Sequence, residues 1–277
     1  MITSLNFYKE KITELESAVP GISNNFKFFL KQALGLSDSS IILNDDVFIK
    51  SNEVRLIERF INLSKKLTPI EYILNSSEFY GRNFYVDNRV LIPRDETELI
   101  IDILLDQGIK GKSKIIDLGT GSGCIGISIA LEIPESFVIG VDRYKDALNV
   151  AIKNKNFHKA SNYEVKQSDW FLDIHDEDFD FVVSNPPYIA PKDEHLKNLT
   201  HEPESALVSL DKGLSDLKKI TCQAYSKLKK GGILIFEHGF NQAEAVREIM
   251  ESNNFYDITN FKDYQLHPRI TLGKKLA

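Results

Sequence analysis

Apolar residues in the first 75 positions recur at steps of three and four, the spacing at which side chains share one face of a helix. Two stretches carry this pattern, with apolar positions at Leu15, Val19, Phe26, Phe29, Leu30, Ala33 and Leu34, and at Val54, Leu56, Ile57, Phe60, Ile61 and Leu63. Thr68 and Glu71 have the spacing of a capping box around Pro69, which predicts a further short helix through Leu74. The pattern predicts a small domain of helices alone over residues 1–75.

The character of the sequence changes over residues 79–92, where aromatic and β-branched residues surround Asp87 and Asn88. These residue types favour strands, and the Asp-Asn pair favours a turn. The segment is therefore predicted to form a β-hairpin that turns at this pair and ends at Pro93. We expect residues 76–93 to link two domains.

From Lys114 onward, predicted strands alternate with predicted helices. Strands are expected at 114–118, 137–142, 163–168, 179–184, 232–237, 255–261 and 269–273. Helices are expected at 95–107, ahead of the first strand, and then at 123–132, 144–157, 213–229 and 240–252. The middle strands are almost continuously apolar, which is typical of parallel strands covered on both faces. Residues 94–277 are therefore predicted to form an α/β domain with a doubly wound, mostly parallel, seven-stranded sheet.

The charge balance disfavours some kinds of partner. The net charge is −6, and residues 1–76 hold nine basic and nine acidic residues, so the acidic excess lies in 77–277. Such a domain is not expected to bind nucleic acid directly over a broad surface. Cys124 and Cys222 form no CxxC pair and the six histidines have no metal-ligand spacing, so no metal site is expected. No secretory signal or membrane-spanning stretch is apparent, so we expect a cytoplasmic enzyme with no membrane partner.

A glycine-rich segment follows the first predicted strand of the sheet. Residues 117–126 read DLGTGSGCIG, where glycines allow a tight turn and a close approach of a ligand to a helix N-terminus. Part of this segment fits GxGxxG, and Asp142 ends the next strand, where an acid can bind ribose hydroxyls, so a dinucleotide dehydrogenase remains open. Asp117 favours another ligand, because a carboxylate repels a pyrophosphate but suits the amino group of a methionine tail. The Asp-x-Gly-x-Gly-x-Gly pattern resembles the cofactor motif of class I S-adenosylmethionine-dependent methyltransferases.

A second motif follows the predicted strand 179–184. Residues 185–188 read Asn-Pro-Pro-Tyr, and the prolines remove two N–H donors, leaving carbonyl oxygens and the Asn185 side chain as acceptors. Two acceptors can hold both hydrogens of a planar NH₂ group, and Tyr188 is expected to stack on that group. Holding an amide nitrogen near an electrophilic methyl group lowers the barrier to displacement without a general base. The motif predicts methyl transfer to a side-chain amide, with Asn185, Pro186, Pro187 and Tyr188 as the catalytic residues.

With both motifs in place, the sequence resembles the peptide chain release factor glutamine methyltransferases, the PrmC/HemK family, over nearly its whole length. The matching positions are Leu91-Ile92-Pro93-Arg94, Glu96-Thr97-Glu98, Asn185-Pro186-Pro187-Tyr188, Glu202-Pro203, Ala206-Leu207, Gly213-Leu214, Gly231-Gly232, Glu237, Gly239 and Gln242. Two positions depart from the family: Asp95 stands where proline is usual, and His267-Pro268-Arg269 lacks the usual glycine-containing turn. The departures concern local loop geometry and the docking of a release factor.

The resemblance implies a class I methyltransferase fold, Rossmann-like, and a substrate, the glutamine of the Gly-Gly-Gln motif of class 1 release factors, methylated on its side-chain nitrogen N5. It implies S-adenosyl-L-methionine as cofactor, S-adenosyl-L-homocysteine as product and no metal. The helical region 1–75 is expected to help dock the substrate. The expected cofactor-binding residues are Asp117, Gly119, Thr120, Gly121, Ser122, Gly123, Asp142, Trp170 and Asn185. In this set the glycine segment holds the methionine part, Asp142 the ribose and Trp170 the adenine, although a lone tryptophan is equally compatible with a core position.

Other functions remain open at this stage. An adenine amino group could occupy the same tetrapeptide, which leaves a nucleic-acid amino-group methyltransferase as the alternative enzyme. A binding protein with an adaptor domain is a further alternative, for which failure to bind S-adenosylmethionine would be the sign.

Overall fold

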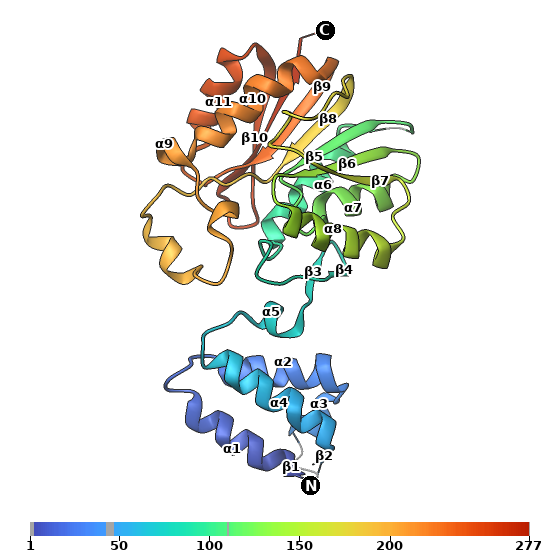
Figure 1. The fold of residues 1–277 in the computed structure, drawn as a ribbon. Coiled ribbons are helices and arrows are strands. Elements are labelled where there is room, and N and C mark those ends of the chain that lie inside the picture. The colour runs from blue at the N-terminus through green and yellow to red at the C-terminus, as the bar shows by residue number, and fades with distance from the viewer. Residues whose placement is uncertain (1–2, 43–46, 110, 277) are drawn as a thin grey trace. The chain divides into compact units, whose positions relative to one another are not determined.

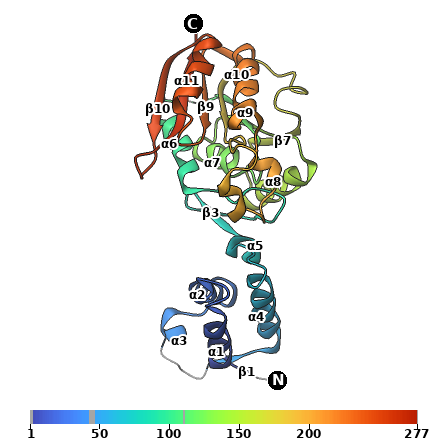
Figure 2. The ribbon, with the colours of Figure 1, turned by 90° about the vertical axis from the view of Figure 1, so that its left-hand side faces the viewer.

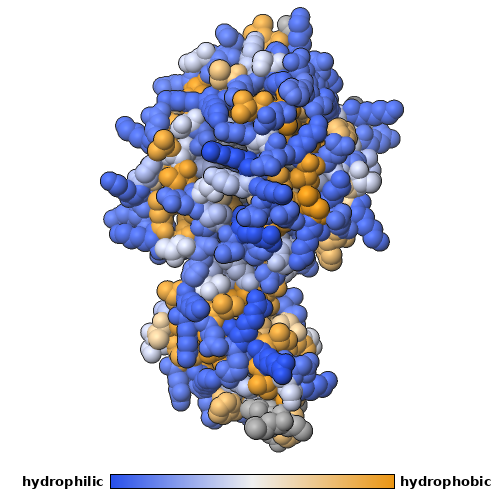
Figure 3. All heavy atoms as spheres, in the orientation of Figure 1, coloured by the Kyte–Doolittle hydropathy of each residue, from blue (hydrophilic) through white to orange (hydrophobic). Residues whose placement is uncertain are grey.

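The computed structural model describes residues 3–42, 47–109 and 111–276. The chain divides into two compact units, Met1–Ser76 and Ser77–Ala277, each with its own hydrophobic core. On the face shown in Figure 3, hydrophilic side chains predominate and apolar ones are scattered among them, which is usual for a protein surface.

The first unit is mainly helical. Its elements are β1 (Thr3–Ser4), α1 (Leu5–Leu15), α2 (Ile22–Leu34), α3 (Asp38–Ile42), β2 (Phe48–Ile49), α4 (Ser51–Ser64) and α5 (Ile70–Leu74). The rings of Phe26 and Phe29 pack on Phe60, with centroids 5.4 and 4.8 Å away, so the aromatic positions of the helical pattern form the centre of this core. The prediction of helices alone is wrong at β1 and β2, which pair antiparallel. Strands of two residues are too short to show a periodic pattern.

The predicted capping box at Thr68 is also wrong. Helix α5 begins at Ile70, with Pro69 as its N-cap and no side-chain cap bond. Leu67 adopts a left-handed conformation (φ 59°), and the Thr68 backbone N–H donates to the Leu63 carbonyl at 3.2 Å. Thr68 therefore belongs to the turn that ends α4, a Schellman-type arrangement, and its side chain does not cap α5.

The second unit is built on a seven-stranded sheet in the order β10-β11-β9-β8-β5-β6-β7 (Figures 1 and 2). The strands are β5 (Lys114–Leu118), β6 (Phe137–Asp142), β7 (Tyr163–Gln167), β8 (Phe179–Ser184), β9 (Leu228–Glu237), β10 (Phe255–Lys262) and β11 (Pro268–Lys275). Strands β5 to β9 run parallel, whereas β11 is antiparallel to both β9 and β10. The predicted mostly parallel, doubly wound sheet is confirmed.

Two layers of helices cover the sheet. One core packs β5 and its neighbours against α6 (Leu99–Asp106) and α7 (Cys124–Glu132), and α8 (Lys145–His158) contacts α7. The other core lies under α10 (Ser215–Lys227) and α11 (Ala243–Ser252). Neighbouring positions in a strand face opposite sides, so Ile115 joins the first core and Ile116 the second. The unbroken apolar strands in the sequence reflect this double burial.

The hairpin lies earlier than predicted. Strands β3 (Ser77–Phe79) and β4 (Arg82–Phe84) are joined at Tyr80 and Gly81, both with positive φ, which is the geometry of a type I′ turn. A turn does form at Asp87 and Asn88, where the Val90 N–H donates to the Asp87 carbonyl at 3.1 Å and the Asp87 carboxylate accepts the backbone N–H and side chain of Arg89, but this turn does not join the strands of the hairpin. Both buried strand ends, Phe79 and Phe84, pack into the first core of the second unit.

Several helix boundaries also differ from the prediction. A 3-10 turn, η1 (Asp95–Glu98), precedes α6, and the predicted helix 213–229 corresponds to α10, which the short α9 (Leu210–Gly213) precedes. Asp211 and Lys212, inside α9, adopt left-handed conformations. Further 3-10 turns are η2 (Glu194–Asn198) and η3 (Glu204–Ala206).

Gly140 in β6 is expected to be essential for packing. A Cβ atom at this position would lie 1.9 Å from the hydroxyl oxygen of Tyr163, a fully buried side chain on the adjacent strand. Gly140→Ala should therefore lower the free energy of unfolding by about 1–3 kcal/mol, the usual range for overpacking. Urea denaturation measures this change, and an unchanged midpoint and slope would contradict the packing described.

Candidate active site

The carboxyl ends of three adjacent strands converge on one cavity. Leu118, the last residue of β5, pairs with Val141 of β6 on one side and Ser184 of β8 on the other. Gly119, Asp142 and Asn185 therefore leave the sheet close together, at the edge where ligands bind in doubly wound folds. The cavity has a volume of about 250 Å³. Its wall includes the predicted residues Gly119, Thr120, Gly121, Ser122, Asp142, Trp170, Asn185 and Pro187.

The glycine loop is held in shape by its neighbours. Gly119, Gly121 and Gly123 have φ of 71°, 53° and 83°, conformations that L side chains rarely adopt. The Thr120 backbone N–H donates to the Val141 carbonyl at 2.8 Å, and the Gly121 N–H donates to Asp142 Oδ2 at 3.0 Å. Gly123 is the N-cap of α7 and does not line the cavity.

Asp117 lies beneath this loop rather than in the cavity wall. Its Oδ2 accepts hydrogen bonds from the Thr120 hydroxyl at 2.6 Å and the Gly126 N–H at 3.0 Å. Burial raises the pKa of this carboxyl to about 7, and Oδ1 has no hydrogen-bond partner among the described residues. Asp117 is fully buried and is not among the residues that line the cavity. Its position is that of a support for the loop.

Asp142 and Trp170 form the other end of the cavity. Asp142 accepts the Gly121 N–H with one oxygen and the Tyr144 N–H with the other, at 2.9 Å, and burial raises its pKa. The Trp170 indole N–H donates to Asp216 Oδ1 at 3.2 Å, and its ring lies against the loop so closely that a Cβ on Gly119 would be 3.3 Å away. Trp170 packs against the second core and also lines the cavity. Its surroundings therefore combine the two environments considered from the sequence, a core position and a ligand-binding surface.

The Asn-Pro-Pro-Tyr segment is held at both ends. The Asn185 Nδ2 group donates to Thr97 Oγ1 at 3.0 Å, and the Tyr188 hydroxyl donates to Glu237 Oε1 at 2.9 Å. Gln242 Nε2 donates to the Tyr188 carbonyl at 3.0 Å. Pro186 and Tyr188 do not line the cavity. The Tyr188 hydroxyl is directed to Glu237, and the stacking of its ring on a bound amide stays a prediction.

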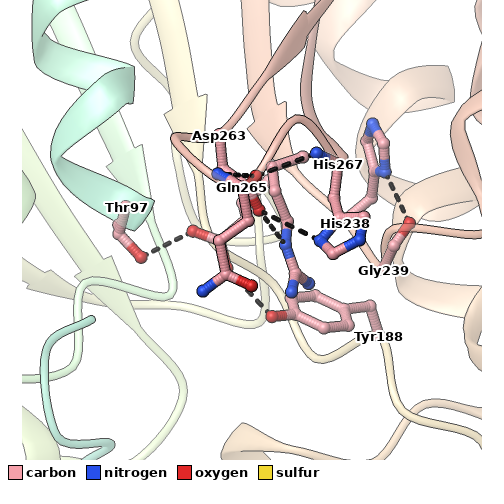
Figure 4. A network of polar contacts seen from close by, with 9 residues as sticks. Thr97, Tyr188, His238, Gly239, Asp263, Gln265 and His267 are labelled. Carbon is pink, nitrogen blue, oxygen red and sulfur yellow. Dashed lines mark hydrogen bonds and ion pairs between the residues drawn. The ribbon is translucent and has the colours of Figure 1, made fainter. Parts of the chain in front are cut away.

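Thr97 and Glu237 belong to this site although the motifs assigned them no role. The Thr97 hydroxyl donates to Glu237 Oε2 at 2.5 Å, and both side chains are buried (Figure 4). Burial raises the pKa of Glu237, against the opposing effects of the Thr97 and Tyr188 hydrogen bonds. The strand pattern contained a signal for Glu237, because it ends β9 and follows Phe236, the partner of Ser184. It thus lies at the same level of the sheet as Asn185.

Two segments outside the sheet complete the cavity wall. Glu202 is buried and accepts the Ile92 N–H at 3.0 Å and an Arg94 guanidinium N–H at 2.5 Å. Further along the chain, Val208 forms a parallel β-bridge with Ile189, which follows the Asn-Pro-Pro-Tyr motif. These contacts join the segment before η1 to the segment after the Asn-Pro-Pro-Tyr motif, and residues of both line the cavity.

The family departure at His267 has a local explanation. The buried Asp263 carboxylate accepts the backbone N–H groups of Gln265 and His267, both at 2.9 Å, and the Arg269 Nε–H at 3.1 Å (Figure 4). Leu266 takes the left-handed conformation (φ 65°) that a glycine usually supplies. The turn between β10 and β11 therefore closes without glycine.

Among the described residues, no group of three or more histidine, cysteine, aspartate or glutamate side chains is arranged to hold a metal ion. Within the same ranges, none of the helices is both long and apolar enough to cross a membrane.

The fold and the cavity define a methyltransferase. A family model described as "Methyltransferase domain" matches residues 109–272. A methyltransferase from Pyrococcus furiosus has a similar structure, with a TM-score of 0.56 and 14% identity, covering 83% of this chain and 100% of that one. The Thermus thermophilus 16S rRNA N2 G1207 methyltransferase, solved with AdoMet and guanosine, gives a TM-score of 0.53 at 16% identity, covering 72% of this chain and 49% of that one. These structures show the fold alone.

Sequence relatives identify the family within this class. The release factor glutamine methyltransferase of Escherichia coli (strain K12) is 31% identical over 97% of this chain and 98% of its own length. Its counterpart in Coxiella burnetii is 35% identical over 90% of both chains, and that of Aliivibrio fischeri is 40% identical over 74% of both. This chain belongs to the release factor glutamine methyltransferase family.

Proposed function

We propose that this chain transfers a methyl group from S-adenosyl-L-methionine to the side-chain amide nitrogen N5 of the glutamine in the Gly-Gly-Gln motif of class 1 release factors. The observation that carries the proposal is the position of Asn185, which leaves the sheet beside the glycine loop with its NH₂ group bonded to Thr97. Its acceptor Oδ1 is thus available in the wall of the cavity. The proposed place of action is the cytoplasm, where release factors act.

The residues around the cavity fit the cofactor. A flat indole, a carboxylate and a loop without side chains at Gly119 and Gly121 offer surfaces for adenine, ribose hydroxyls and a methionine tail, respectively. When bound, the cofactor supplies an electrophilic methyl group on a sulfonium. Asp117 supports the loop from inside, and Asp142 accepts the ribose hydroxyls with lone pairs that its two backbone bonds leave free.

The substrate amide is held by acceptors rather than activated by a base. Asn185 Oδ1 and a main-chain carbonyl of the two-proline segment accept the two N–H groups of the glutamine, because neither proline has an N–H to compete. This fixes the nitrogen in position for in-line attack, and the proton leaves from the product nitrogen afterwards. Pro187 contributes to the wall, while Pro186 and Tyr188 keep the segment in its shape.

The function is tested by labelled methyl transfer to a purified class 1 release factor and to its Gly-Gly-Ala variant. Label on the first alone is the expected result. Equal label on both proteins would contradict the assignment of the glutamine. Label on neither, with the cofactor bound, would also contradict it and would direct attention to nucleic-acid amino groups.

We further propose that the helical unit, residues 1–75, helps to dock the release factor. The proposal is supported by exposed aromatic side chains on this unit, Phe7, Phe28 and Phe48, since aromatic residues are enriched in binding hot spots. Replacing Phe7 and Phe48 by serine should weaken release-factor binding by about tenfold while leaving the cofactor dissociation constant unchanged. Tyr264→Ser, an exposed position of the second unit, is the matched control. Unchanged release-factor affinity in both the Phe7→Ser/Phe48→Ser variant and a variant without residues 1–75 would contradict the docking role.

A further inference from the structure

Three side chains from distant parts of the second unit form one hydrogen-bonded chain that begins in the cavity wall and ends in the interior. Thr97 comes from η1, Asn185 follows β8 and Glu237 ends β9. The Asn185 Nδ2 group donates to Thr97 Oγ1, and the Thr97 hydroxyl donates to Glu237 Oε2. Tyr188 donates to the other oxygen of the same carboxylate (Figure 4).

The chain has a direction. A carboxylate accepts hydrogen bonds and donates none, so the single hydroxyl hydrogen of Thr97 is committed to Glu237. Thr97 Oγ1 can then only accept a hydrogen from Asn185. The group of Asn185 that faces Thr97 must therefore be its NH₂, and the carbonyl oxygen Oδ1 must face the other way.

An unsupported asparagine would have no such preference. The two ends of a carboxamide have nearly the same shape, and only hydrogen-bond partners decide which end points where. Thr97 and Asn185 both line the cavity, so the preference set by Glu237 reaches the surface that meets a ligand. Glu237 itself is buried and does not line the cavity.

We propose that Thr97 and Glu237 are positioning residues that hold the Asn185 carboxamide with Oδ1 toward the substrate, so that the site accepts a side-chain NH₂ group and rejects a side chain that presents only oxygen acceptors. The inference deepens the proposed function and rests on it. In its terms, the site binds a glutamine and discriminates against a glutamate of nearly identical shape, because the glutamate carboxylate would face Oδ1 with no hydrogen to share.

Discrimination of this kind is a matter of unpaired polar groups. A site built to accept a hydrogen bond leaves its acceptor without a partner when the ligand offers another acceptor, which gives large selectivity factors. If the Asn185 carboxamide could rotate by half a turn, its NH₂ group would face the carboxylate of a substrate glutamate, and much of the selectivity for glutamine would be lost.

The test compares binding of two release-factor variants, Gly-Gly-Gln and Gly-Gly-Glu, to wild-type enzyme, Thr97→Val and Thr97→Ser. Valine keeps the branched shape but has no hydroxyl, whereas serine keeps the hydroxyl. Wild type and Thr97→Ser are expected to prefer the glutamine protein by ~10-fold or more, and Thr97→Val should reduce this ratio several-fold and lower kcat. The cofactor dissociation constant, measured on each variant, confirms that the fold is intact, and Thr97→Ala serves if the valine variant does not fold.

The two positioning residues should also be coupled. Glu237→Gln is expected to lower kcat in the wild-type background but to have little further effect once Thr97 is valine, because both changes interrupt the same chain. Additive losses, or a glutamine preference unchanged by Thr97→Val and Thr97→Ala, would overturn the inference. Failure of the proposed function is distinguished from this result, since it appears in the wild-type enzyme as absence of methyl transfer to the Gly-Gly-Gln protein.

Discussion

Replacing Asn185 with alanine is expected to lower turnover by roughly 10²–10³-fold, the usual loss when one preorganised hydrogen-bonding group at a reacting centre is removed. The Asn185 carboxamide donates a hydrogen bond to Thr97 through its NH₂ group. Its oxygen is the acceptor proposed to hold the glutamine nitrogen in position. Alanine at this position leaves the backbone carbonyls and the cofactor surfaces in place. The loss should therefore appear in kcat, measured under saturating cofactor.

Asn185→Asp provides a sharper control. Aspartate has almost the same shape but cannot donate to Thr97, which is already committed as a donor to Glu237. It should be as inactive as the alanine variant, although it still carries an oxygen at the Oδ1 position. Near-normal turnover of either variant would remove Asn185 from the proposed mechanism.

Asp142→Ala is expected to weaken cofactor binding by roughly 10–100-fold, equivalent to about 1.4–2.8 kcal/mol. Two effects combine: the ribose loses its proposed acceptor, and the N–H of Gly121 loses the carboxylate that holds the loop at 3.0 Å. Isothermal titration with S-adenosylmethionine measures the change.

Asp146→Ala is the matched control for this variant, because Asp146 is an exposed carboxylate in the first turn of α8, near in sequence but outside the cavity wall. It should leave the dissociation constant unchanged. An Asp142→Ala enzyme that binds cofactor as tightly as wild type would mean that Asp142 supports neither ribose nor loop.

The sheet was predictable because its central strands bury side chains on both faces, each face in a separate hydrophobic core. Apolar residues at consecutive positions, such as Ile115 and Ile116, have no explanation in an amphipathic element, and they identify strands covered on both faces. The hairpin was misplaced because residue composition points to strands in general, while the turn depends on which residue pair adopts positive φ. Tyr80 and Gly81 do so, whereas the turn at Asp87 and Asn88 does not join the strands of the hairpin.

The site was predictable to the extent that it lies at strand ends. Gly119 and Asn185 each follow a strand and Asp142 ends one, so pattern alone indicates that they meet. The side-chain partners could not be predicted in this way. Asp117 could face a ligand or the interior, and only the positions of Thr120 and Gly126 decide the matter. Thr97 is 140 residues from Glu237 along the chain, and no local pattern relates them.

The place of β11 in the sheet has a consequence for how the protein is made. This strand, Pro268–Lys275, lies between β9 and β10, although both precede it in the chain. At a synthesis rate of ~5–20 residues per second, the roughly 40 residues from the end of β9 to the end of β11 take about 2–8 s to emerge. During that interval the nascent chain presents β9 as an open edge, with free N–H and C=O groups that can pair with another chain. A transcript cut short before Pro268 would leave that edge permanently open, so its product should aggregate rather than persist as a slightly shortened enzyme.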